Sequence, residues 1–391
     1  MRPYGSGTAL SARCAALFAS YYALLYPAAM MFSTYMVLLG YDRSLIAVLM
    51  SVSGVVSLLS RPLIGTLSDR GLCRKTAVVL ILMMAAGTAV FFLLPDRTVY
   101  HAAAYVVMCS TACGCSMDLI DSWAVKLVKQ TGSVDYGKTR AFGSGSFALT
   151  SLIFGWLLAE FGIGLAPWAI FLLLSLFLIS VLSVPEPKTE MPGQNRAGIA
   201  KAKELLNDRK YLIFIIFYAM ANATFMFTDT YIPVLILERG GNTAQTGLND
   251  CIMAAIEFMF LRHFTQVADR LGTERVVWLG MLGFCVKACM AAVMPTPALI
   301  ILACTTQIIS FCFFMPSRMR FLEKNVEHRD LGIALSVSSL ASSLFSTVVA
   351  NPAASRIIPV FGTGKTMMMF GLLSAFCGIG FALSLKIVDK K

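Results

Sequence analysis

Long apolar runs separated by short polar connections recur along the whole chain. Twelve of them are long enough to cross the roughly 30 Å hydrocarbon core of a bilayer, which needs about 20 helical residues. The runs are continuous rather than alternating, which favours helices over the strands of a barrel. The pattern therefore predicts an all-α membrane protein with twelve transmembrane helices. The runs lie near residues 13–38, 44–66, 76–95, 99–125, 140–160, 166–184, 210–237, 245–266, 275–294, 298–317, 331–354 and 363–387.

The composition agrees with a membrane chain. Of the 391 residues, 58% are hydrophobic and only 14% are charged, and the mean hydropathy is +0.75. A soluble globular domain has about 25% charged residues. The first apolar run begins near Arg13, is too long for the apolar core of a signal peptide and lacks a small-residue cleavage pattern, so we expect it to remain as the first helix.

Residues 185–209 interrupt the series of apolar runs. The segment Pro185–Gln194 is polar and rich in helix breakers, whereas 198–209 mixes Lys, Glu and Arg with Ala and Leu and predicts a short amphipathic helix on the membrane surface. We therefore expect a cytoplasmic linker between an N-terminal half at 1–184 and a C-terminal half at 210–391. Two halves of six helices each are typical of secondary transporters.

Basic residues concentrate on every second connection. Both termini and the even-to-odd connections hold 25 of the 32 Lys and Arg residues, and the opposite side holds five. By the positive-inside rule, this asymmetry predicts that both termini lie in the cytoplasm, and we expect the protein in the plasma membrane. Anionic lipid head groups account for the net charge of +11, so no nucleic-acid partner is expected. The five are Arg43, Arg97, Arg239, Arg356 and Lys365, while Arg61 and Lys287 fall inside apolar runs.

No grouping of residues predicts an enzyme, a metal site or a cofactor. Most of the 11 cysteines lie inside apolar runs without His or carboxylate residues at ligand spacing, so we interpret them as packing residues. The three histidines lie at predicted helix ends. The segment Gly362–Thr366 lacks the glycine spacing of a phosphate-binding loop, so ATP-driven transport is not expected.

Two charged residues lie deep inside apolar runs of the C-terminal half. Glu257 is near the middle of the eighth run and Lys287 is inside the ninth. A carboxyl group buried without a partner would be neutral at pH 7, whereas a nearby Lys would keep it ionised. Membrane proteins that retain such groups usually use them. We therefore predict that Glu257 carries a coupling proton with Lys287 as its partner; a static interhelical ion pair is the alternative.

A short acid–base motif follows both the second and the eighth run. An Asp at the cytoplasmic end of a helix can bridge to a neighbouring helix, while the basic residues beside it meet lipid phosphate or helix C-termini. The residues of the motif are Gly65, Asp69, Arg70 and Arg74 in the first copy and Asp269 and Arg270 in the second.

At these residues the chain resembles the major facilitator superfamily, whose motif between helices two and three reads roughly Gly-x-x-x-Asp-Arg-x-Gly-Arg-Arg. Arg74 stands one position later than usual, and Thr265 replaces the glycine of the second copy. The resemblance implies the twelve-helix fold in two halves and transport by alternating access.

A narrower resemblance comes from Asp135–Ser144, which is similar to the Tyr-Gly-x-x-Arg-x-x-Gly-Ser signature of the branch containing lactose permease and the nucleoside permeases. It implies that Asp121 and Arg140 bind substrate hydroxyls, because a carboxylate and a guanidinium offer directional acceptors and donors to a polyol. A salt bridge that only closes the cytoplasmic side is the alternative. Phe147 stands where the branch has an aromatic that stacks on the sugar, with ordinary helix packing as the alternative.

The remaining polar residues inside apolar runs complete the predicted site. Asn222 and Gln307 are candidates to contact substrate, and Asp118 is a second candidate for coupling. The tenth run has no ionisable residue at 307–313, where lactose permease has part of its proton site, so uniport stays an alternative.

Together these features predict a proton-coupled importer of a sugar, nucleoside or similar small polar solute. The expected partners are that solute, protons and membrane lipids, and the chain is expected to be a monomer. An exporter of amphipathic compounds is the alternative within transporters, favoured by the 22 Met and 27 Phe residues. A nontransporting membrane sensor is the alternative from a different class.

Overall fold

The computed structural model describes residues 7–95, 98–132, 136–187, 196–261, 263–327 and 330–388. Within these ranges the chain is almost entirely helical and no strand is seen, which confirms the all-α prediction. By length and composition, ten of the described helices can cross a membrane, and a bent pair raises the number to eleven. The predicted count of twelve stays a prediction.

The chain divides into two compact units. Unit 1 comprises Met1–Tyr41, Val52–Gly193 and Thr246–Ala254, and unit 2 comprises Asp42–Ser51, Gln194–Gln245 and Ala255–Lys391. The division along the main length of the chain falls between Gly193 and Gln194, inside the expected linker. Two helices, α3 (Arg43–Asp69) and α11 (Thr243–Leu261), contribute residues to both units.

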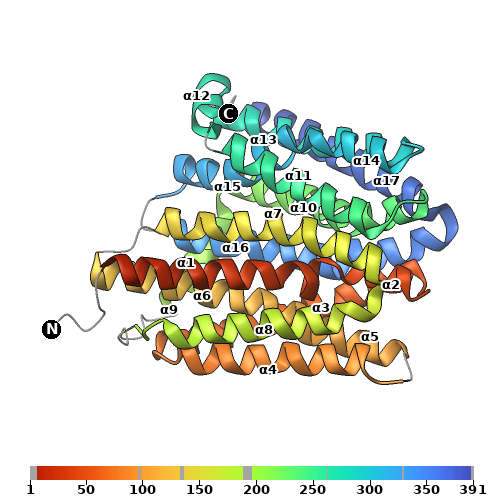
Figure 1. The fold of residues 1–391 in the computed structure, drawn as a ribbon. Helices are drawn as coiled ribbons and strands as arrows, with labels where there is room; N and C mark the ends of the chain where they lie inside the picture. The colour runs from red at the N-terminus through yellow and green to blue at the C-terminus, as the bar shows by residue number, and fades with distance from the viewer. Residues whose placement is uncertain are drawn as a thin grey trace. The chain divides into compact units, whose positions relative to one another are not determined.

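Most of unit 1 is built from α1 to α8 (Figure 1). Short π-helical segments join α1 to α2 and α5 to α6, and a 3-10 turn precedes α8. The helices are α1 (Gly7–Leu25), α2 (Phe32–Leu38), α3 (Arg43–Asp69), α4 (Cys73–Phe92), α5 (Val99–Tyr105), α6 (Thr111–Thr131), α7 (Tyr136–Phe161) and α8 (Ala166–Ser183).

The π-helical segment Tyr26–Met30 shows how a broken helix is accommodated inside unit 1. Pro27 has no N–H group, so a carbonyl in the preceding turn of α1 loses its backbone donor; the carbonyls of Pro27 and Ala28 themselves accept side-chain hydroxyls. The hydroxyl of Tyr35 donates to the carbonyl of Pro27 at 2.8 Å, and the hydroxyl of Tyr105 donates to that of Ala28 at 3.0 Å. Buried tyrosines therefore satisfy carbonyl groups that lipid could not.

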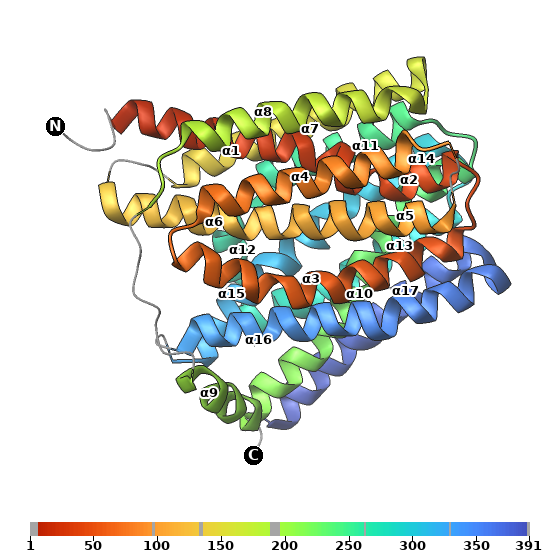
Figure 2. The same ribbon diagram turned by 90° about the horizontal axis from the view of Figure 1, so that it is seen from below.

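Most of unit 2 is built from α9 to α17 (Figures 1 and 2). Asp208 caps the start of α10, because its carboxylate accepts the backbone N–H of Tyr211 at 2.8 Å. The helices are α9 (Arg196–Asn207), α10 (Arg209–Glu238), α11 (Thr243–Leu261), α12 (Phe264–Leu271), α13 (Thr273–Val293), α14 (Pro297–Cys304), α15 (Phe311–Asn325), α16 (Leu331–Leu344) and α17 (Asn351–Val388).

The chain reverses direction within α17. Gly362 has a φ of 79°, outside helical geometry and in the region that favours glycine. Figure 2 shows the blue chain running along α16, turning back and returning to the C-terminus. The apolar stretch Leu331–Val388 is 58 residues long, enough for two crossings of about 20 residues each.

The eighth apolar run, expected as one helix over 245–266, is bent in the structure. α11 ends at Leu261, and α12 continues at an angle of 61°. α12 buries Phe264 and Ala268, while its other residues are exposed or half-exposed. A short helix with one apolar face suits a membrane surface rather than its interior, which explains why the run does not continue straight.

The tenth apolar run is also discontinuous. α14 ends at Cys304, a 3-10 turn spans Thr305–Ile308, and α15 begins at Phe311. Gly283 of α13 lies against this break, and a Cβ atom there would overlap the backbone carbonyl of Ile309. The missing side chain therefore allows the interrupted backbone to approach α13 closely. Gln307, within the 3-10 turn, is placed beside α13 as a result.

Candidate functional site

The predicted pair in unit 1 is brought together by α6 and α7. The Nε atom of Arg140 lies 3.8 Å from Oδ1 of Asp121, and the Tyr136 hydroxyl donates to the same oxygen at 3.0 Å. The side chains of Arg140 and Asp121 are 27% and 32% exposed. The ion pair is long and partly open, so both partners retain free hydrogen-bonding capacity.

An aromatic surface from α1 lies beneath this pair. The Arg140 guanidinium is 4.3 Å from the centre of the Tyr22 ring and 5.9 Å from that of Phe18, within the range of cation–π attraction. α7 reaches α1 this closely at Gly143, where a Cβ atom would lie 2.6 Å from the Tyr22 ring. The buried Tyr22 hydroxyl has no hydrogen-bond partner among the described residues.

Phe147, predicted to stack on substrate, contacts another aromatic residue. Its ring meets that of Tyr26 edge to face, with 5.6 Å between the ring centres. This contact belongs to the packing of α7 against the π-helical segment Tyr26–Met30.

Unit 2 brings Glu257, Gln307 and Lys287 together. The Lys287 ammonium donates to Oε1 of Gln307 at 2.6 Å, and Nε2 of Gln307 donates to Oε1 of Glu257 at 2.8 Å. Lys287 and Gln307 are 2% and 3% exposed. The sequence predicted Lys287 as the direct partner of Glu257, but the structure places an amide between them. A primary amide suits this position, because one end accepts and the other donates.

Two other polar residues of α10 differ in their surroundings. Asp229 is exposed. Asn222, predicted to contact substrate, is buried at 5% exposure.

The second copy of the acid–base motif holds α12 against α15. Asp269 forms an ion pair with Arg320, which also donates to the carbonyl of Thr265 at 3.3 Å. Arg270 is exposed. These contacts join the end of the eighth run to the tenth, as expected of an Asp that bridges to a neighbouring helix.

In the first copy, Arg74 contacts the end of another helix. Its Nη2 donates to the carbonyl of Val184, the C-cap of α8, at 2.8 Å, and its backbone N–H donates to Glu186 at 3.2 Å. Gly65 and Arg70 are exposed, and the side chain of Asp69 is outside the described part of the structure. A guanidinium at a helix C-terminus is favourably placed relative to the helix dipole.

Arg61, inside the second apolar run, pairs with a predicted coupling residue. Its Nε lies 3.5 Å from Oδ2 of Asp118, which had been predicted as a coupling residue. The argument that singled out Glu257 and Lys287, a charge inside an apolar run, applies equally to Arg61. That charge was the feature of the sequence that could have identified Arg61 as a site residue.

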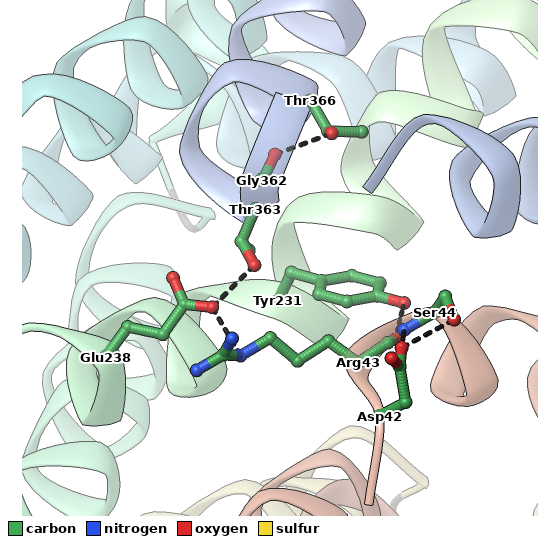
Figure 3. Close-up of polar contacts among 8 residues, drawn as sticks. All are labelled: Asp42, Arg43, Ser44, Tyr231, Glu238, Gly362, Thr363 and Thr366. Carbon is green, nitrogen blue, oxygen red and sulfur yellow. Dashed lines mark hydrogen bonds and ion pairs between the residues drawn. The ribbon is translucent and has the colours of Figure 1, made fainter. Parts of the chain in front are cut away.

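A second group that sequence reasoning missed is drawn in Figure 3, entirely within unit 2. Arg43 Nε lies 2.6 Å from Oε1 of Glu238, and the Thr363 hydroxyl donates to that same oxygen at 2.7 Å (Figure 3). The Tyr231 hydroxyl donates to the backbone carbonyl of Arg43 at 3.0 Å. One carboxylate thereby joins the start of α3, the end of α10 and the turn at Gly362.

The sequence of this chain matches a known protein family. Residues 13–341 match the MFS_1 like family. The chain belongs to this family. The predicted relationship to major facilitator transporters is thereby confirmed, and the protein is a multi-pass membrane transporter rather than an enzyme.

Individual relatives of this MFS_1 like protein are also transporters. The chain is 24% identical over 302 residues to maltose permease of Geobacillus stearothermophilus, covering 77% of this chain and 73% of the relative. It is 23% identical over 356 residues to the uncharacterized transporter YwbF of Bacillus subtilis (strain 168), covering 89% and 86%.

Solved structures share the fold. A mutant of the nucleoside transporter NupG aligns with a TM-score of 0.82 at 17% identity, covering 96% of this chain and 99% of that one. A POT family transporter in complex with a thioalcohol conjugated peptide aligns with a TM-score of 0.72 at 14% identity, covering 97% and 96%.

Proposed function

We propose that this MFS_1 like protein imports a sugar, nucleoside or similar small polar solute together with protons. The observation that carries the proposal is the buried bridge in which Gln307 joins the Glu257 carboxylate to the Lys287 ammonium. Charged groups inside a membrane-spanning bundle are costly, and proteins that keep them generally use them for ion or substrate pathways.

The bridge offers a physical basis for coupling. Hydrogen bonds to charged groups are about twice as strong as those between neutral groups. A proton on Glu257 removes its negative charge, so the bond from Gln307 weakens and the bridge from Lys287 no longer ends in a carboxylate. The protonation state of Glu257 thereby changes which arrangement of α11, α13 and the break in the tenth run is most stable. An equilibrium between two arrangements is shifted in proportion to that difference.

The pair in unit 1 supports a hydroxyl-bearing solute. Asp121 supplies acceptors, Arg140 supplies donors in a fixed plane, and the 3.8 Å separation leaves both able to bond a third group. The buried Tyr22 ring helps to hold the Arg140 guanidinium in place by cation–π attraction. The maltose permease and the nucleoside transporter among the relatives are both named for polyhydroxylated solutes, which agrees with this chemistry.

Transport in proteoliposomes tests the coupling role of Glu257, with maltose and uridine as probes. Under an inward proton gradient, Glu257→Gln should abolish accumulation of the transported probe but retain exchange of internal for external probe. Exchange needs the loaded protein to reorient but needs no net deprotonation. Continued accumulation by Glu257→Gln would assign coupling to another residue and overturn the proposal.

We also propose that both termini and the 185–209 linker are cytoplasmic, as the 25-to-five asymmetry of basic residues indicates. A single cysteine placed in the linker, in a variant without reactive native thiols, should be protected from an impermeant thiol reagent added to intact cells. Modification of that cysteine from outside would reverse the topology.

A further inference from the structure

Arg61 and Asp118 form a second carboxylate–guanidinium pair in unit 1. Their side chains are 44% and 53% exposed, although both lie in membrane-spanning segments, Arg43–Ser68 and Val99–Thr131. Arg61 is about 27 Å along α3 from Arg43, and about 12 Å before Asp69, at 1.5 Å per residue. Charged side chains at such depth face the bundle interior or water rather than lipid. The exposed surface of this pair is therefore a polar surface of unit 1.

The position of the Arg61 side chain depends on a glycine in α6. A Cβ atom on Gly114 would lie 3.3 Å from Nη2 of Arg61 and 3.5 Å from the Ser57 hydroxyl. The 3.3 Å separation is shorter than an ordinary van der Waals contact. The absence of a side chain at Gly114 therefore leaves space for the Arg61 guanidinium beside α6. From there it reaches Asp118, one turn further along the helix.

α6 also sets the distance between the two pairs. Asp118 and Asp121 are three residues apart, so they occupy the same face of the helix with their Cβ atoms about 5–6 Å from each other. Arg61 reaches Asp118 from α3, and Arg140 reaches Asp121 from α7. The hydroxyl of Tyr22, which has no partner in the described part of the chain and whose ring lies beneath Arg140, provides one more buried polar group at this end.

We propose that the Arg61–Asp118 pair is a second part of the substrate site and that it selects a hexose-containing sugar over a nucleoside. Each pair presents an acceptor next to a donor, which is the arrangement that bonds two neighbouring hydroxyls. The ribose of a nucleoside has one pair of neighbouring ring hydroxyls, whereas a hexopyranose has several on one ring. Two adjacent pairs therefore match a hexose better. This inference rests on the proposed function of Asp121 and Arg140.

Calorimetric titration of the purified full-length protein with maltose and with uridine tests the selection. Asp118→Asn and Arg61→Gln should each weaken maltose binding by more than tenfold and change uridine binding less than threefold. Gly114→Ala removes no charge and should weaken maltose binding about threefold. The matched control, Lys324→Gln, breaks an exposed ion pair with Glu274 in unit 2 and should change neither affinity.

A charge-exchanged variant separates binding from structural support. Arg61→Asp combined with Asp118→Arg retains an ion pair. It should therefore recover any thermal stability that the single variants lose, but not the affinity for maltose that they lose. Recovery of both would make the pair a structural tether and overturn the inference.

The remaining outcomes distinguish the inference from the function on which it rests. Loss of maltose binding in Asp121→Asn but not in Asp118→Asn would overturn the inference alone. Equal losses of maltose and uridine binding in Asp118→Asn would overturn the selection of a hexose. A wild-type protein that binds uridine but not maltose or any other hexose-containing sugar would overturn the inference and leave the proposed function standing, whereas one that binds no sugar, nucleoside or similar polar solute would contradict both.

Discussion

The two units place their ionisable residues in contrasting surroundings. In unit 1, Asp121 and Arg140 are about one-third exposed and 3.8 Å apart. In unit 2, Lys287 is 2% exposed and reaches Glu257 only through Gln307, by bonds of 2.6 and 2.8 Å. An open pair can exchange its partners for a ligand at little cost, whereas a change of charge in a buried bridge alters the stability of every group bonded within it. The difference suits binding in one unit and coupling in the other.

Removing the amide should give the largest effect on stability. Gln307→Leu keeps a similar volume but leaves the Lys287 ammonium and the Glu257 carboxylate without their bridging hydrogen bonds. We expect a loss of about 3–5 kcal/mol in the free energy of unfolding, measured by thermal denaturation in detergent. Adding Lys287→Met and Glu257→Gln removes both charges and should recover most of the stability. A Gln307→Leu protein as stable as the wild type would show that the bridge is not a stabilising element.

The close approach at the break in the tenth run should be the next most sensitive feature. Gly283→Ala would place a methyl group against the carbonyl of Ile309, and relieving that overlap should cost about 1–3 kcal/mol. Gly332 of α16 has nothing within 4 Å of an added Cβ, so Gly332→Ala is the matched control. Equal stabilities of the two variants in the same denaturation assay would contradict the close approach.

The open pair of unit 1 should respond in affinity rather than in stability. Asp121→Asn and Arg140→Gln should each weaken binding of the transported probe by more than tenfold, or about 1.4 kcal/mol. Their thermal midpoints should shift little, because partly exposed ion pairs contribute at most about 1 kcal/mol. A large loss of stability with unchanged affinity would reverse the contrast between the units. Calorimetric titration and denaturation of the same samples give both quantities.

Asp42 is an exposed carboxylate outside both the unit 1 pair and the unit 2 bridge. Removing one of its hydrogen bonds should have the smallest effect on stability. Its carboxylate accepts the hydroxyl and backbone N–H of Ser44, which lowers the pKa of Asp42 below its ordinary value of 3.8. A lowered folded-state pKa stabilises the protein above that ordinary value, and the contribution is lost as the pH falls through the folded-state pKa. Ser44→Ala should cost under about 1 kcal/mol at pH 7. The difference from wild type should shrink as the pH falls below 3.8 and through the lowered pKa of Asp42; a difference that grows in acid would contradict this assignment.

The sequence predicted the helices and singled out the charged residues inside them. It predicted less well which residues contact each other. Apolar length alone identified most membrane-spanning segments, because a bilayer imposes nearly the same length on each. Breaks inside an apolar run, such as the one at Thr305–Ile308, could not be found this way. They depend on tertiary contacts, such as the approach of Ile309 to Gly283.

The candidate site shows the same limit. Glu257 and Lys287 stood out as charges in apolar runs, but the role of Gln307 between them depends on how α13 packs against the interrupted tenth run. Neutral amides are common at helix contacts, so the residue type alone does not reveal a bridge. Arg61 shows the opposite case, because its charge was visible in the sequence while its partner Asp118 required the structure.

Because α3 and α11 each contribute residues to both units, one cut in the chain cannot separate the two units. A cut in the linker would yield two chain fragments whose ends do not coincide with the compact units. The first fragment would lack Thr246–Ala254 of unit 1, and the second would lack Asp42–Ser51 of unit 2, including the Arg43 that pairs with Glu238. Each fragment expressed alone would thus be missing part of its own fold, and co-expression would have to supply it from the other.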